Sequence, residues 1–78
     1  MEPYQALANA IVEVAVKDYK TALKYHYAHP ERNEYAAEVA ELEKFFRSGW
    51  YGMLTDLDGE YLMDGIRRMV RQGKLVLN

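Results

Sequence analysis

The sequence predicts an all-α fold, a small three-helix bundle with a short C-terminal tail. Apolar side chains recur at helical spacing through most of the chain, whereas strand-like sequence is limited to residues 74–77, too few to build a sheet. Pro30, Gly49 and Gly73 interrupt the helical pattern where helices would begin or end. A length of 78 residues is that of one helical domain, 1–78.

The first helix is expected from about Pro3 to Tyr27. Proline suits a first turn because its missing N–H has no intrahelical partner there. The helix should stop near His29, because Pro30 disfavours the α conformation in the residue before it. Its apolar face consists of Ile11, Val12, Ala15, Val16, Tyr19, Ala22 and Leu23.

The second helix is expected to begin at Pro30 or Glu31. Gly49 interrupts its pattern and leaves two alternatives, a helix over 31–54 or a break at Gly49 that lets the following chain fold back. The apolar stripe of this region consists of Tyr35, Val39, Leu42, Phe46, Trp50 and Met53.

The third helix is expected to be capped by Asp56 or Asp58 and to end at Gly73. Its apolar positions are Leu57, Tyr61, Leu62, Ile66, Met69 and Val70. The corner between the second and third helices should pack Trp50 and Leu57 against the first helix. The tail then covers residues 74–78.

Composition argues against several functions. The net charge of −2, from 10 basic and 12 acidic residues, lacks the basic surplus of a nonspecific nucleic-acid binder. Without cysteine there is no thiolate metal site and no cysteine nucleophile. His26 and His29 are only two ligands, and Asp56-Leu57-Asp58-Gly59 lacks most of a calcium loop. We expect no metal, no cofactor and no enzymatic activity.

The sequence also carries no pattern of a signal peptide and no apolar run approaching 18 residues. A cytoplasmic protein without a membrane partner is therefore expected.

Aromatic residues are the strongest indication of binding. Seven Tyr, two Phe and one Trp are many for a bundle with few fully buried positions, so several rings should lie at its edge. Tyrosine and tryptophan are enriched in binding hot spots. Tyr25, Tyr27 and Tyr51 are the candidates for a partner-binding patch; the alternative is that they cover the ends of the core.

A basic cluster near the C-terminus suggests a different function. Arg67, Arg68, Arg71 and Lys74 are candidates for phosphate contact, and most of them share one helix face. The plainer interpretation is a solvated last turn whose positive charge complements the helix dipole.

Residues 45–62, FFRSGWYGMLTDLDGEYL, resemble a pattern of small uncharacterised proteins on prophages and integrative elements of Firmicutes. Gly49 departs from the polar or charged residue expected there, and the basic third helix departs from the acidic ends of that group. Small acidic helical proteins in this setting often bind and block a host protein, as anti-CRISPR proteins do. The resemblance thus implies a setting, and inhibition of a bacterial defence component is the function expected from it.

Three hypotheses follow. The leading one is a non-enzymatic protein of a phage or mobile element that binds and inhibits a host defence or regulatory protein, such as a CRISPR-Cas component. The second is a small DNA-binding accessory protein or transcription regulator that uses the basic third helix. The third is a self-associating protein in which exposed aromatic residues pair across a homodimer interface.

Overall fold

The computed structural model describes residues 3–73, and within that range it contains four α-helices and no strand. Helix α1 spans Pro3–Ala28, α2 spans Asn33–Phe46, α3 spans Gly49–Leu54 and α4 spans Gly59–Arg71. The all-α prediction is confirmed, but four helices replace the expected three, since the corner contains a short helix of its own. The predicted tail lies outside the described residues.

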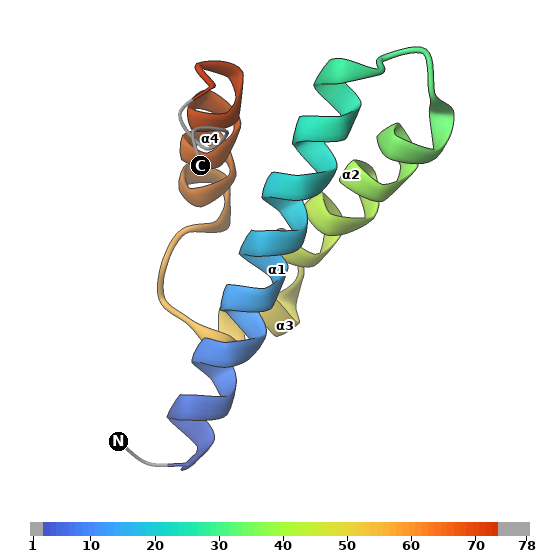
Figure 1. Ribbon diagram of the computed structural model, residues 1–78. Helices are drawn as coiled ribbons and strands as arrows, with labels where there is room; N and C mark the ends of the chain where they lie inside the picture. The colour runs from blue at the N-terminus through green and yellow to red at the C-terminus, as the bar shows by residue number, and fades with distance from the viewer. Residues whose placement is uncertain (1–2, 74–78) are drawn as a thin grey trace.

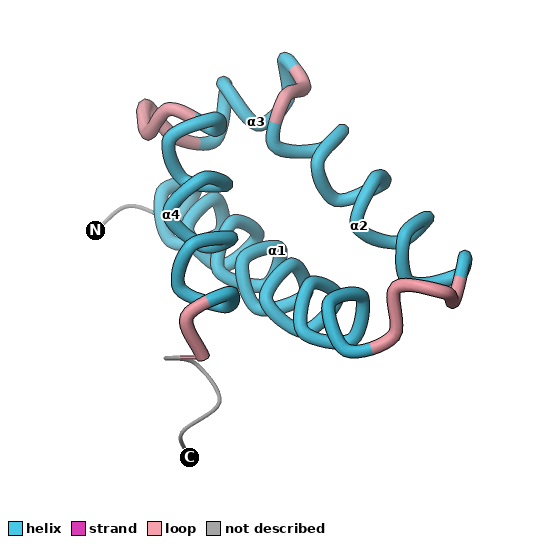
Figure 2. Tube along the Cα trace, turned by 90° about the horizontal axis from the view of Figure 1, so that it is seen from above, coloured by secondary structure: helices cyan, strands magenta, loops and turns pink. Residues whose placement is uncertain are grey.

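Helix α1 is the central element, with α2 on one flank and α4 on the other (Figure 1). Seen from above, α2 and α4 lie on either side of α1, and α3 lies between the end of α2 and the loop that leads into α4 (Figure 2). The Tyr4 hydroxyl donates to the Met53 carbonyl oxygen at 3.4 Å, which joins the N-terminal part of α1 to α3. The two halves of α1 therefore have different neighbours.

The chain breaks between α2 and α3 because Ser48 caps α3. Its backbone is extended, its hydroxyl accepts from the Tyr51 N–H at 3.1 Å, and the same hydroxyl donates to the Phe45 carbonyl oxygen at 2.7 Å. A serine in this position satisfies a free N–H of the new helix. Of the two sequence alternatives, the break near Gly49 is correct and the continuous helix over 31–54 is wrong.

This break rotates the following residues relative to the stripe of α2. Tyr51 and Leu54, three residues apart on α3, are buried at 3% and 6% exposure, whereas Trp50 is 55% exposed. Trp50 was expected to pack against α1, but it is more than half exposed, and its ring makes an edge contact with that of Phe45 at a centroid distance of 5.6 Å. Leu57 lies beside Val12 and Val16 of α1, as expected, although it stays 46% exposed.

The core lies where α1, α2 and α4 meet. Tyr19 is fully buried at its centre, with its ring 5.4 Å from that of Phe46, and Phe46 contacts Tyr51 at 5.5 Å. The core cluster consists of Ala15, Tyr19, Ala22, Leu23, Val39, Phe46, Tyr51, Met63, Ile66 and Val70. The corner after α2 thus contributes to the core through Tyr51.

Helix α4 begins and ends at residues the sequence singles out. Asp58 is the cap, since its Oδ1 accepts from the Glu60 N–H at 3.1 Å. Gly59 follows and is buried against the carbonyl end of α2, where a Cβ atom would lie 2.2 Å from the Phe46 carbonyl oxygen. At the other end, Gly73 has φ +76°, the left-handed conformation that terminates helices.

Candidate functional site

The three tyrosines predicted to form one patch lie in three different surroundings. Tyr25 is 47% exposed and stacks on Tyr35 of α2, with ring centroids 5.5 Å apart. Tyr27 is 38% exposed and lies under the Arg71 guanidinium of α4 at 6.0 Å. Residues two apart point about 200° apart around a helix, so these rings lie on opposite flanks of α1. Tyr51 belongs to the other end of the molecule.

The prediction that Tyr51 belongs to an exposed binding patch is wrong. Its side chain is buried at 3% exposure, so it is no part of an exposed patch. Burial raises the pKa of its phenol, and its hydroxyl has no hydrogen-bond partner among the described residues. The physical reason is the break at Ser48, which turns Tyr51 inward and Trp50 outward.

Replacing Tyr51 with phenylalanine is expected to leave the free energy of unfolding unchanged or to raise it by up to about 1 kcal/mol, because a buried hydroxyl without a partner costs free energy. Tyr19→Phe is the matched control. It removes a hydroxyl that is hydrogen-bonded, so it should lower the free energy of unfolding by about 1–2 kcal/mol. Urea unfolding followed by circular dichroism measures both. Equal losses in the two variants would show that the Tyr51 hydroxyl is satisfied.

The basic cluster is not a free cationic face. Arg67 is directed inward, where its Nη1 donates to the Tyr19 hydroxyl at 3.1 Å and to Glu43 Oε2 at 3.2 Å. The Tyr19 hydroxyl itself donates to the same Oε2 at 2.7 Å. Burial, followed by the hydrogen bond to Glu43, raises the pKa of Tyr19 well above its usual value. Arg67 therefore belongs to a structural triad that joins α1, α2 and α4.

The other predicted phosphate contacts are also accounted for. Arg68 pairs with Asp64 one turn earlier on α4, and Arg71 covers Tyr27. Lys74 lies outside the described residues. Among the three candidate arginines, which all lie within residues 3–73, Arg71 is thus the one without a carboxylate partner.

The triad extends into a second link between α2 and α4. Arg47 lies 3.7 Å from Glu43 Oε1 and also pairs with Glu60 in the first turn of α4. Glu43 is thus shared by two arginines, and its side chain is only 21% exposed. This network of ion pairs joins α4 to α2.

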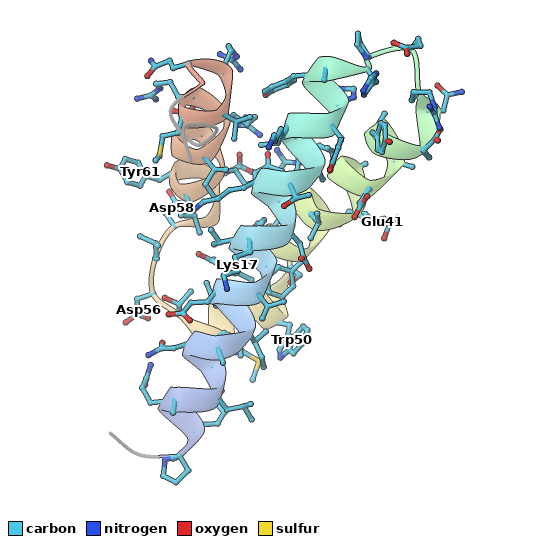
Figure 3. The ribbon with its side chains drawn as sticks, viewed as in Figure 1. Lys17, Glu41, Trp50, Asp56, Asp58 and Tyr61 are labelled. Carbon is cyan, nitrogen blue, oxygen red and sulfur yellow. The ribbon has the colours of Figure 1, made fainter. Side chains whose placement is uncertain are left out.

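Sequence reasoning missed an apolar surface at the end of the molecule formed by α3 and the first half of α1. We call it the α1–α3 surface. Its large exposed side chains are Tyr4 at 55%, Leu7 at 60%, Val14 at 57%, Trp50 at 55% and Met53 at 73% exposure. Figure 3 shows Trp50 projecting from α3 into solvent. The seven-residue spacing of Leu7 and Val14, outside the main apolar face of α1, was the signal available in the sequence.

Two kinds of site are not found among residues 3–73. No group of three or more His, Cys, Asp or Glu side chains is placed to hold a metal ion. No helix in this range has the length and apolar character needed to cross a membrane.

Comparisons with known proteins add no relative. No protein-family model, no curated protein and no solved structure matches the chain.

Proposed function

We propose that this chain is a non-enzymatic protein-binding module of a phage or mobile element that inhibits a host protein. The observation that carries the proposal is the α1–α3 surface, where Trp50, Met53 and Leu7 are each more than half exposed. Exposed apolar clusters on small proteins mark interaction sites, and tryptophan is prominent among binding hot spots.

The setting and the target class rest on the resemblance of residues 45–62 to small prophage and integrative-element proteins. In that setting, a component of a CRISPR-Cas type defence system is the proposed target. The DNA-binding alternative has less support, because Arg67 and Arg68 are already paired with carboxylates. A pull-down of the tagged protein from bacterial lysate at two salt concentrations, with and without nuclease, separates the two. One stoichiometric protein that survives both treatments supports inhibition by protein binding, whereas recovery that nuclease abolishes supports the alternative.

Replacing Trp50 with alanine is expected to reduce capture of that protein at least about tenfold, as truncation of an aromatic hot spot does. Met53→Ala, in the next turn of α3, should reduce it in the same direction. Quantitative mass spectrometry of the captured protein measures the effect. Since both side chains are exposed, helicity and urea unfolding should be nearly unchanged.

Tyr61→Ala is the matched control for this series. Tyr61 is an aromatic side chain with 75% exposure, but it lies on α4, away from the α1–α3 surface (Figure 3). It should leave capture unchanged. Equal capture by the Trp50 variant and the wild-type chain would remove the α1–α3 surface from the proposal.

A further inference from the structure

A second surface, on the opposite flank of α1, has a different chemistry. An open groove runs between α1 on one side and the first turn of α4 with the segment before it on the other. Its floor consists of Val12, Val16, Leu57 and Leu62. Val16 is two residues from Val14, so it points about 200° away from the α1–α3 surface. We call this feature the α1–α4 groove.

The rim of the groove is cationic. Lys17 and Lys20 line it, and Lys24 continues the same edge one turn further along α1. None of these lysines takes part in any ion pair among residues 3–73. With spacings of three and four residues, they form a row about 10 Å long.

Glu13 lies one turn before Lys17 on the same edge, but no carboxylate of residues 3–73 forms an ion pair with this row. Glu13 also lines the groove, and it is the one acidic residue that does so. Asp58 is engaged as the cap of α4. Figure 3 shows Asp56 on the outer side of the connection to α4, away from Lys17. The groove therefore offers an apolar floor beside a row of unpaired positive charges.

From this geometry we propose that the α1–α4 groove binds an acidic amphipathic helix of a partner protein. A helix of that kind places an apolar stripe on the floor, and glutamates at spacings of three and four residues along one edge face the lysine row. In this direction of the partner helix, its glutamates face the lysines along the full row. In the opposite direction the same glutamates would lie on the far edge, so electrostatic complementarity favours the first direction. This goes beyond the proposed function, because it adds a second site with a stated ligand chemistry.

Two other occupants match the groove less well. Nucleic acid would use the lysine row but gain nothing from the floor formed by Val12 and Val16. A second copy of this chain would offer α2 as its acidic helix. Val39 and Phe46 of α2 are buried in its own core. The exposed residues of α2 are Asn33, Glu34, Ala36, Ala37, Glu38, Ala40, Glu41 and Lys44, so this helix offers no free stripe of large apolar side chains. A partner helix with a free apolar stripe satisfies both the floor and the rim.

The experiment uses a fluorescein-labelled peptide of about 18 residues, roughly five helical turns, with a leucine stripe flanked by glutamates. Fluorescence anisotropy should show saturable binding to the full chain at or below about 100 μM, weakening as salt is raised. A peptide with the same leucines and lysines in place of the glutamates should bind at least about tenfold more weakly. Equal binding of the two peptides, or none of the glutamate peptide, overturns the proposal.

Charge-reversal variants of the groove lysines test whether the peptide binds in the groove. Lys17→Glu and Lys20→Glu should each weaken binding of the glutamate peptide about three- to tenfold. Lys44→Glu makes the same change in net charge on α2, outside the groove, and should alter it less than about twofold. A new glutamate at position 20 has lysines three and four residues away on α1, which supports the helix. The same loss in all three variants would show a net-charge effect and overturn the proposal.

Further measurements separate the remaining occupants. Trp50 is the single tryptophan of the chain and lies outside the groove, so its emission should not change when the tryptophan-free peptide binds. A blue shift would place the peptide on the α1–α3 surface instead. Sedimentation that shows self-association lost in Lys20→Glu, or displacement of the peptide by duplex DNA, would assign the groove to those occupants. Loss of lysate capture in Trp50→Ala tests the proposed function independently of all these results.

Discussion

Gly59→Ala is expected to lower the free energy of unfolding by about 2–4 kcal/mol, more than alanine at any other glycine of residues 3–73. The added Cβ would lie 2.2 Å from the Phe46 carbonyl oxygen and 3.1 Å from its carbonyl carbon. Both atoms belong to the backbone at the end of α2, where Phe46 is 2% exposed, so neither can move without disturbing the core. Urea unfolding followed by circular dichroism measures the loss.

Gly65→Ala is the control within the same helix. A Cβ atom at Gly65 meets nothing within 4 Å, and alanine is the better helix former, so the free energy of unfolding should rise by up to about 1 kcal/mol. The two alanine variants thus shift stability in opposite directions. A Gly59→Ala protein as stable as the wild type would contradict the close approach of α4 to the end of α2.

Glu43→Ala is expected to lower the free energy of unfolding by about 2–3 kcal/mol. It would leave the Tyr19 hydroxyl, in a fully buried side chain, without its acceptor, and Arg67 without its carboxylate. The loss is placed below that of a fully buried ion pair because the side chains of Glu43 and Arg67 are 21% and 26% exposed. Thermal and urea unfolding measure it.

Two further variants test whether the loss of stability in Glu43→Ala comes from the triad. Glu41→Ala removes the same side chain from the same helix, but Glu41 is 74% exposed and pairs only with Lys44, so stability should change by less than about 0.5 kcal/mol. Glu43→Gln keeps an acceptor for Tyr19 and loses the charge, so it should fall between wild type and Glu43→Ala. If Glu43→Ala and Glu41→Ala were equally stable, the triad would not be what holds α4.

The helices were predictable because their signals are local. Apolar spacing, the proline at position 30, the cap at Asp58 and the terminator at Gly73 each act within one turn of the residue concerned. The additional helix α3 was not predictable from periodicity. It is only six residues long. Trp50 and Met53 are three residues apart on one face, and Tyr51 and Leu54 are three residues apart on the adjacent face, so apolar spacing does not show which pair is buried.

The orientation of Tyr51 and Trp50 depends on the register of α3. Ser48, acting as a cap, selects the one in which Tyr51 enters the core, and no count of apolar residues distinguishes it from the other. The hydrogen bonds of Arg67 could not be predicted for a different reason. Its partners Tyr19 and Glu43 are 48 and 24 residues away in sequence, so only the packing of three helices reveals that this arginine is engaged.

The α1–α3 surface explains why exposed aromatic side chains still point to protein binding after Tyr51 is removed from the predicted site. Trp50 replaces Tyr51 in the proposed site, because the break at Ser48 exposes Trp50 and buries Tyr51. Leu7 and Val14 extend that surface along α1. The hypothesis of a protein partner is thus retained with different residues.

Photocrosslinking from position 50 shows whether the α1–α3 surface contacts a protein partner. Trp50 is replaced by the photoreactive residue p-benzoylphenylalanine, Tyr61 is replaced by the same residue in a second protein, and both are irradiated in nuclease-treated bacterial lysate. We expect one discrete crosslinked protein from position 50 and none from position 61. Crosslinks that are the same from both positions, or only between copies of this chain, would contradict it.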